Sequence, residues 1–423
     1  MKPVLEIAKD ARRASLELAN IPTSIKNRAL EFIADFLLED AEKIIAANAK
    51  DIAAAAAAGL SKPMLERLAV NDKKIAAMVE GVKQVIALPD PVGEIIEESV
   101  RPNGLQIKKV RVPIGVIGII YESRPNVTID CAILCLKSGN AAILRGGSEA
   151  FQTNMALAGV ISRALKAAGL NENCVQILPS SDRALLNEML SMDSYINCII
   201  PRGGEGLIRF VVKNSTIPVL KHYKGVCTVF IDKSADLRLA EILAVDAKCQ
   251  RPSVCNAAEN LIVHSDAEDE ILPKIAKLLV ERGVELRASE RAAKILKSAN
   301  IDCKPATEQD FSTEYIDLII SIDIVDSVDG AVEFINKYGS GHSDLIVTSD
   351  AKSAEVFLNG VDSATVYWNA STRFTDGFEF GLGAEIGIST DKLHARGPMG
   401  LREMCSYKYK ILGSGQTRGE PIK

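Results

Sequence analysis

Apolar residues recur at three- and four-residue spacing through the first part of the chain. Residues 4–19 (VLEIAKDARRASLELA) and 24–57 both show this pattern, which is typical of helices with one buried face. Asn71 or Asp72 could cap a further helix over residues 73–87, because a short polar side chain accepts hydrogen bonds from a first helical turn. The pattern therefore predicts a helical region up to about residue 90.

After Pro91 the pattern changes to strand-like segments separated by helix-length stretches. Residues 105–112 alternate between apolar and polar side chains, and the runs after them are almost wholly apolar. Such runs are typical of parallel strands that are covered on both faces, and parallel sheets bind ligands at the carboxyl ends of their strands. The predicted strands are 105–112, 115–121, 141–144, 174–178, 195–200 and 226–231.

A second alternating set begins near residue 260, so we expect a second α/β domain. Its predicted elements are strands at 260–264, 317–322, 344–348 and 364–369, with helices at 267–282 and 328–338 among them. The fold class predicted for the whole chain is α/β. The expected domains are 1–231, 232–365 and a C-terminal segment at 366–423.

Composition narrows the class of protein without naming an activity. The chain has 423 residues and a net charge of -5, which gives no electrostatic footprint for nucleic acid or an anionic membrane. Its nine cysteines are odd in number and widely spread, so they do not suggest a disulfide framework. No signal peptide or membrane-spanning run is evident. We expect a reduced, soluble, cytoplasmic protein.

One cysteine, Cys255, lies in the stretch KCQRPSVCNAAEN (248–260). Cys249 is six residues away, which is not the close spacing of a metal site, and no metal is predicted. Nearby cations lower the pKa of a thiol, and Lys248 and Arg251 are close in sequence. A buried structural thiol is the alternative. A Cys–His dyad also stays open, with His222, His264, His342 and His394 as the histidines of the chain.

Two glycine-rich turns follow predicted strands. Gly203, Gly204 and Gly206 precede or open a helix, where free N–H groups could hold a phosphate, although a plain turn is the alternative. Arg145 ends another strand, before a helix that Ser148 could cap, and its guanidinium could pair with a phosphate. A solvated arginine is the alternative there.

A third stretch, residues 369–390 (NASTRFTDGFEFGLGAEIGIST), combines glycines with Arg373, Asp376 and Glu379. This composition suits an ordered loop whose polar groups converge on a small molecule. A buried interface loop is the alternative.

Four segments together resemble one family. They are residues 121–150 (YESRPNVTIDCAILCLKSGNAAILRGGSEA), 248–259, 369–390 and 393–404 (LHARGPMGLREM). They are similar to the γ-glutamyl phosphate reductases, also called glutamate-5-semialdehyde dehydrogenases, of the aldehyde dehydrogenase superfamily. The resemblance covers nearly the whole chain and keeps the segments in the family's order.

The resemblance implies NADPH-dependent reduction of L-glutamyl 5-phosphate to L-glutamate 5-semialdehyde and phosphate, the second step of proline biosynthesis from glutamate. It also implies a Rossmann-like cofactor domain in 1–231, a catalytic α/β domain in 232–365, and a substrate loop and oligomerisation element in 366–423. It implies a stand-alone reductase without a fused kinase domain, a homo-oligomer, and a transient contact with glutamate 5-kinase.

The family's site residues are carried over one by one. Cys255 matches the nucleophile that forms a thioester, and its backbone N–H is the first candidate for stabilising the oxyanion. Asn126 is the nearest match to the superfamily's oxyanion asparagine. The cofactor candidates are Arg145 at the adenosine ribose and its 2′-phosphate, the turn of Gly203, Gly204 and Gly206, and Glu314 at the nicotinamide ribose. Pro201 replaces the first glycine of the superfamily's turn.

Two further expectations concern the substrate and water. Candidates for the substrate's phosphate and α-carboxylate are Arg124, Lys248, Arg251 and Arg373, and Asp376 or Glu379 would meet its ammonium group. The stretch 220–232 (LKHYKGVCTVFID) lacks the general-base glutamate of hydrolytic relatives, which fits an acyl acceptor other than water. The alternatives are a CoA-acylating aldehyde dehydrogenase and a catalytically silent binding protein of the same fold.

Overall fold

The computed structural model describes residues 2–221 and 223–419, which divide into two compact units. The first contains the chain up to residue 221 together with 381–387 and the residues from 399 onward. The second contains the chain from there to residue 380 together with 388–398. The expected C-terminal segment 366–423 is thus shared between the two units and does not form a part of its own.

Helices dominate the start of the first unit, as the apolar spacing predicts. The side chain of Asn71 caps one of them by accepting a hydrogen bond from the backbone N–H of Lys74 at 3.0 Å. Buried Val4, Ile7 and Ala11 show the one-sided burial of an amphipathic helix. These helices are α1 (Val4–Leu18), α2 (Thr23–Glu39), α3 (Ala41–Ala57), α4 (Lys62–Leu68) and α5 (Asp72–Ala87).

A four-stranded parallel sheet with the order β5-β4-β3-β6 follows. All six residues of the inner strand β3 are buried, which explains its continuous apolar run. The strands are β3 (Val116–Tyr121), β4 (Ala141–Arg145), β5 (Val175–Ile177) and β6 (Cys198–Arg202). The helices between and after them are α6 (Asn126–Lys137), α7 (Phe151–Ala167), α8 (Arg183–Leu190) and α9 (Glu205–Asn214).

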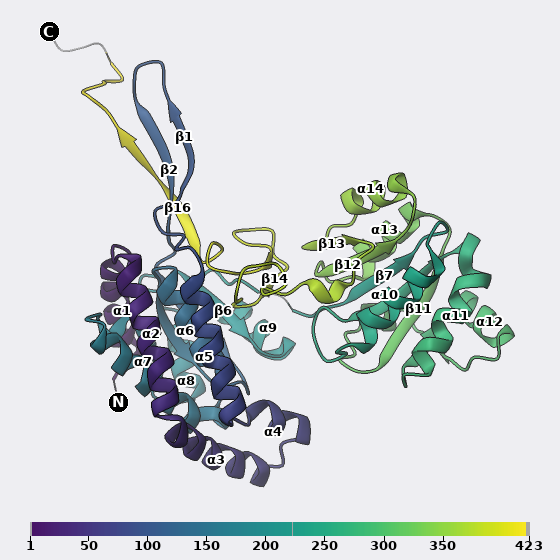
Figure 1. Cartoon of the computed structure of the whole chain (residues 1–423), viewed down its shortest axis with the longest axis horizontal. Helices are drawn as coiled ribbons and strands as arrows, with labels where there is room; N and C mark the ends of the chain where they lie inside the picture. Colours follow the sequence, from purple (N-terminus) through teal and green to yellow (C-terminus); the bar gives the residue numbers. More distant parts are fainter. Residues whose placement is uncertain (1, 222, 420–423) are drawn as a thin grey trace. The chain divides into compact units, whose positions relative to one another are not determined.

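The first unit also carries a three-stranded antiparallel sheet, β1-β2-β16. Figure 1 shows β1 (Ile95–Val100) and β2 (Gln106–Pro113) as a hairpin with β16 (Cys405–Leu412) beside it. Only the middle strand is predicted. Residues 95–100 lack an alternation of apolar and polar side chains, whereas residues 405–412 do alternate and are missed.

The second unit is built on a seven-stranded parallel sheet with the order β10-β9-β11-β8-β7-β12-β13. The strands are β7 (Cys227–Ile231), β8 (Ala258–His264), β9 (Glu285–Ala288), β10 (Lys304–Pro305), β11 (Ile319–Val325), β12 (Ser343–Val347) and β13 (Thr365–Trp368). The helices are α10 (Leu237–Cys249), α11 (Glu268–Val280), α12 (Glu290–Ser298), α13 (Val328–Tyr338) and α14 (Ala351–Gly360). A short hairpin pairs β14 (Ile388–Ser389) with β15 (Gly397–Pro398).

Both faces of this sheet are buried, which is why its strands read as continuous apolar runs. On β7, Val229 and Ile231 pack with residues of α10, α11 and α12, while Phe230 packs on the other face with residues of α13 and α14. The run at 226–231 was expected to close the first domain at residue 231. This boundary is too late, because β7 pairs in parallel with β8 and β12 of the second unit.

Two features of the described residues concern membrane-spanning helices and disulfide bonds. Among them, no helix combines the length and the apolar character needed to span a bilayer. All nine cysteines lie in the described part of the chain, and each is a free thiol.

Candidate active site

Cys255 lies on a turn between α10 and β8, where Pro252 prevents the helix from continuing. Its side chain is half-buried, in contrast to the fully buried Cys227 of the neighbouring strand. The thiol of Cys227 donates a hydrogen bond to the carbonyl oxygen of Cys255 at 3.3 Å. The hydrogen bond from β7 therefore stabilises the turn, while the side chain of Cys255 stays partly accessible.

Gly225 supports the same turn by allowing close contact. A Cβ atom at this position would lie 1.8 Å from the carbonyl oxygen of Cys255, far inside van der Waals contact. Only glycine permits the backbone of residue 225 to approach so closely. The glycine in the stretch 220–232 thus shapes the turn that presents Cys255.

The substrate loop of the second unit is tied to this turn through Asn256. The Asn256 Nδ2 donates hydrogen bonds to the carbonyl oxygens of Arg373 at 3.3 Å and Thr375 at 2.9 Å. In return, Thr372 Oγ1 donates to the carbonyl oxygen of Asn256 at 2.7 Å. The residue after the nucleophile candidate therefore fixes the backbone on either side of Arg373.

Several charges gather around Arg373. Burial and the neighbouring Arg251 guanidinium lower the pKa of Arg373, whereas Asp246, Cys255 and Asp376 act in the opposite direction. The Arg373 Nε also donates a hydrogen bond to Gln250 Oε1 at 3.0 Å. Arg373 is thus within electrostatic reach of Arg251, Asp376 and Cys255. Glu379, the other acidic candidate, is exposed on the same loop.

Lys248 has a different environment from the other substrate candidates. Its side chain is fully buried, and its Nζ lies 2.7 Å from Oε2 of Glu259, which is also fully buried. Burial raises the pKa of Glu259 to about 7, against the opposing effect of Lys248. The ammonium group of Lys248 therefore forms a buried ion pair with Glu259 and does not face a ligand.

Glu314 lies on the loop that precedes β11, in the same unit as Cys255. Its charge contributes to raising the pKa of Glu259, so the two carboxylates are near each other.

Two of the histidines considered for a dyad are buried: His264 and His342. His342 Nδ1 lies 3.8 Å from the Cys227 sulfur, and His222 is outside the described residues.

The first unit places the cofactor candidates at the carboxyl ends of its parallel strands. Gly203 and Gly204 follow β6, Gly206 lies in the first turn of α9, and Arg145 ends β4. The Gly204 N–H donates to Glu122 Oε2 at 3.1 Å, so this helix terminus already binds a carboxylate. A Cβ atom at Gly204 or Gly206 would meet open space, whereas one at Gly203 would lie 2.4 Å from Glu122 Oε2.

Arg145 is well placed for an anionic group. Its Nη2 donates to the carbonyl oxygen of Ser181 at 2.6 Å, while its Nε is buried and has no partner among the described residues. Burial lowers its pKa, and Glu149 and Glu122 oppose that effect. An orphaned guanidinium donor beside a glycine turn fits the phosphate-bearing half of a nicotinamide cofactor.

Three predictions near this edge are changed or limited by the structure. Ser148 does not cap the following helix, since the helical turn begins at Ser148 itself and Gly147 takes the position before it. Asn126 opens α6, and its Nδ2 donates to Asp130 Oδ2 at 2.8 Å, a local contact. Arg124 is exposed on the loop after β3. Arg124 and Asn126 belong to the first unit, so their roles at Cys255 stay predictions.

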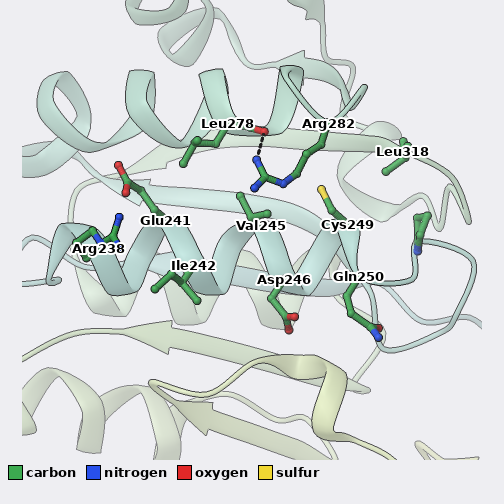
Figure 2. A pocket seen from close by; sticks show the side chains of 11 residues that line it. Arg238, Glu241, Ile242, Val245, Asp246, Cys249, Gln250, Leu278, Arg282 and Leu318 are labelled. Carbon is green, nitrogen blue, oxygen red and sulfur yellow. Dashed lines mark hydrogen bonds between the residues drawn. The ribbon is translucent and has the colours of Figure 1, made fainter.

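A groove of about 790 Å³ lies next to the nucleophile turn (Figure 2). Gln250 and Pro252 line it, but neither Cys255 nor Arg373 does. Figure 2 shows the Arg282 guanidinium in this groove, donating a hydrogen bond to the carbonyl oxygen of Leu278 at 3.0 Å. Cys255 therefore does not line this groove.

The sequence does not predict the residues that contact the turn of Cys255 or pair with Lys248. Gly225, Cys227 and Asn256 hold the turn, and Glu259 neutralises Lys248. A signal was present for two of them, because Asn256 and Glu259 flank two small residues directly after Cys255. Gly225 and Cys227 are distant in sequence and become neighbours only through the pairing of β7 with β8.

Two parallel sheets, a half-buried cysteine on a tight turn and a glycine turn at the carboxyl ends of strands fit the class of α/β dehydrogenases. The aldehyde dehydrogenase family model matches residues 2–291. The chain belongs to this family and, within it, to the γ-glutamyl phosphate reductases.

Individual relatives support this assignment. The γ-glutamyl phosphate reductase of Opitutus terrae is 56% identical over 413 residues, which cover 97% of both chains. The crystal structure of that enzyme from Thermotoga maritima is 48% identical, with a TM-score of 0.96 over 99% of this chain and 100% of the other. An engineered glycolyl-CoA reductase with bound NADP⁺ is 15% identical, with a TM-score of 0.68 over 97% of both chains, and shows the fold alone.

Proposed function

We propose that this chain reduces L-glutamyl 5-phosphate to L-glutamate 5-semialdehyde and phosphate, with NADPH as reductant and Cys255 as nucleophile. The observation that carries the proposal is the group of Cys255, Arg251 and Arg373 on two turns joined through Asn256. A thiol near the Arg373 guanidinium, which in turn lies near that of Arg251, suits an acyl donor that carries phosphate. The membership in the γ-glutamyl phosphate reductases supplies the substrate class.

The chemistry proposed for Cys255 has two stages. Its thiolate attacks the acyl carbon of the substrate, a C–S bond forms, and the C–O bond to phosphate breaks as phosphate leaves with the electron pair. The resulting thioester becomes a thiohemiacetal by accepting a hydride, and this collapses as the C–S bond breaks to give the aldehyde and the free thiolate. Backbone N–H groups of the turn, that of Cys255 first, would stabilise the oxyanion of each stage.

The residues of the second unit have distinct proposed roles. Arg373 and Arg251 would hold the phosphate and the α-carboxylate of the substrate, and Asp376 would meet its ammonium group. Lys248 has no part in this proposal, because its ammonium group is buried against Glu259. Arg124 and Asn126 of the first unit are proposed to complete the substrate and oxyanion contacts.

Members of the aldehyde dehydrogenase family use nicotinamide cofactors, and the residues of the first unit fit one. When bound, the cofactor supplies the hydride. We propose that Gly203, Gly204 and Gly206 receive its pyrophosphate at the start of α9. Arg145 would contact the adenosine ribose and favour NADPH through the 2′-phosphate, and Glu314 of the second unit would orient the nicotinamide ribose.

We propose that phosphate, and not water, is the group that attacks the acyl carbon of the thioester in the reverse reaction. The stretch 220–231 contains no carboxylate that could activate water next to Cys255. Glu259, the acidic residue nearest to Cys255 in sequence, is occupied by Lys248. The CoA-acylating alternative is not favoured, because the relatives with high identity over the whole chain are γ-glutamyl phosphate reductases.

The thioester gives a direct test. The purified protein is mixed with glutamate semialdehyde and NADP⁺ without phosphate, quenched in acid, digested and analysed by mass spectrometry. We expect the glutamyl group on the peptide that contains Cys255, and its loss after phosphate is added before the quench. A Cys255→Ser variant serves as control. Rapid NADPH formation with no modified peptide in the wild type would contradict the thioester.

We also propose that the chain assembles into a homo-oligomer through the sheet β1-β2-β16. The outer strands of this sheet expose large apolar side chains, which soluble proteins usually cover by association. They are Ile95, Ile96, Val100, Tyr407, Tyr409, Ile411 and Leu412.

Two further proposals concern the cell. Nine free thiols suit a reducing compartment such as the cytoplasm.

A transient contact with glutamate 5-kinase is proposed because acyl phosphates hydrolyse readily in water. Rapid dilution of a mixture of kinase and reductase tests this contact. The yield of semialdehyde per acyl phosphate formed should be higher than in a control mixture with a kinase that does not associate with the reductase. Equal yields would contradict the contact.

A further inference from the structure

A fully buried ion pair lies at the base of the turn that carries Cys255. Lys248 is in the last turn of α10, Glu259 is the second residue of β8, and their charged atoms are 2.7 Å apart with 0% exposure on both sides. The residues between them form the nucleophile turn. Burying two charges is costly, and a neutral pair of similar volume is often at least as stable. Stability alone is therefore a weak explanation for this pair.

The carboxylate of Glu259 has a second contact, on the loop that carries Glu314. Its Oε1 accepts a hydrogen bond from the backbone N–H of Ile316 at 3.4 Å. Ile316 has a φ of +56°, in the left-handed region that β-branched residues rarely adopt. Such a conformation persists only where the surroundings hold it in place.

Two other contacts hold the same loop, one from β8 and one from the segment before β7. Asn260, the neighbour of Glu259 on β8, donates from Nδ2 to the carbonyl oxygen of Phe311 at 3.0 Å. Lys224 Nζ donates to the carbonyl oxygen of Ser312. The loop before β11 is therefore anchored at both ends, and Glu259 provides the anchor closest to Glu314.

We propose that Lys248 and Glu259 are positioning residues that fix the turn of Cys255 relative to the loop of Glu314. Lys248 joins Glu259 to the end of α10, and Glu259 joins that end to the strained residue Ile316. This inference rests on the proposed function, in which Cys255 carries the acyl group and Glu314 orients the nicotinamide ribose. Hydride transfer requires the two reacting atoms to be aligned at close contact, so small displacements of either turn slow it strongly.

The test replaces both charges at once, because removing one would leave the other buried without compensation. In Lys248→Met with Glu259→Gln, the side-chain volumes are nearly kept. We expect kcat of the reverse reaction to fall at least tenfold and the Kd for NADP⁺, measured by fluorescence titration, to rise at least threefold. The KM for phosphate should change less than twofold, since the arginines that bind it remain. Glu259→Asp, which keeps the charge but shortens the reach to Ile316, should shift kcat and Kd in the same direction.

A matched control is available in the first unit. Lys26 and Asp90 form another buried ion pair, 2.6 Å apart with 1% and 8% exposure. The variant Lys26→Met with Asp90→Asn should leave kcat and the Kd for NADP⁺ unchanged, whatever its effect on Tm.

The inference is overturned if the Lys248 and Glu259 double variant keeps wild-type kcat and Kd, or if its losses equal those of the control pair. If the double variant does not fold, the Glu259→Asp variant decides by the same two measurements. Wild-type protein without any phosphate-dependent reaction would instead remove the proposed function. The NADP⁺ titration needs no turnover, so it would still decide whether the pair positions the loop of Glu314.

Discussion

At the scale of single residues, the chemistry of this protein depends on which charges reach Cys255. Arg373 is held by Gln250 and by the backbone contacts of Asn256, close to Arg251 and Asp376. A guanidinium held in a fixed orientation can bind a phosphate through two parallel hydrogen bonds, which a lysine cannot do. Lys248, seven residues before Cys255, contributes nothing of this kind because it faces Glu259.

We predict that Arg373→Ala raises the KM for phosphate in the reverse reaction about 10- to 100-fold, because a hydrogen bond to a charged group contributes about 1.5–3 kcal/mol. Arg373→Lys should recover only part of the loss. Steady-state kinetics with varied phosphate measure the effect. The surface residue Arg291, which pairs with Glu268 and Asp326, provides the control Arg291→Ala with unchanged KM. An unchanged KM in Arg373→Ala would remove this residue from the phosphate site.

A second residue-scale prediction concerns pH and Asp344. This carboxyl is buried in β12, where it accepts hydrogen bonds from the Thr228 N–H and the Ser363 hydroxyl, and burial raises its pKa to about 7. The folded chain thus holds this proton more tightly than the unfolded chain. Its contribution to stability is present at low pH and is lost as the pH rises through about 7.

We expect the free energy of unfolding to fall by roughly 3 kcal/mol between pH 5 and pH 8 from this group, at about 1.36 kcal/mol per pKa unit. Asp344→Asn should lack that part of the pH dependence. Trp368, the single tryptophan, lies on the neighbouring strand β13 and reports urea unfolding by fluorescence. Parallel pH profiles for wild type and variant would contradict the assignment.

At the scale of elements, the turn of Cys255 is shaped by the strand that packs beneath it. Gly225 leads into β7 and lies against the backbone of Cys255. Cys227, two residues on, donates to the same carbonyl group. The pairing of β7 with β8 therefore sets the position of the nucleophile, and the substrate loop follows through Asn256.

We predict that Gly225→Ala leaves the protein folded but lowers kcat about 100-fold, because the added Cβ displaces the backbone of Cys255 by an ångström or more. The rate at which iodoacetamide modifies Cys255 should change as well. Gly159→Ala is the control: its Cβ meets open space within α7, and helix propensity predicts a gain of about 0.5–1 kcal/mol. Wild-type kcat in Gly225→Ala would show that the turn does not depend on this contact.

At the scale of the whole molecule, the exposed apolar side chains of the sheet β1-β2-β16 predict association. We expect sedimentation velocity to show a dimer or larger species at micromolar concentration. Tyr409→Lys with Ile411→Lys should shift the population toward monomer, because two buried ammonium groups would oppose the interface. A wild-type monomer at these concentrations would contradict the proposed role of the sheet.

The sequence predicts the two α/β sets well, because strands buried on both faces leave continuous apolar runs such as those of β3 and β7. It does not predict β1, whose residues follow no alternation, and it misses β16 although Tyr407, Tyr409 and Ile411 alternate with lysines. The predictions for Cys255, Arg373 and Asp376 come from motifs within single segments and stay predictions. Lys248 is misjudged, and Gly225 is missed, because their environments are created by residues that are close only in the folded chain.

The central claim is that Cys255 forms a thioester that is released by phosphate. The most direct test is NADPH formation from glutamate semialdehyde and NADP⁺, with and without phosphate, for wild type and Cys255→Ala. We predict turnover that requires both phosphate and Cys255. Equal NADPH formation without phosphate would show that water accepts the acyl group, and turnover in Cys255→Ala would show that the thiol is not the nucleophile.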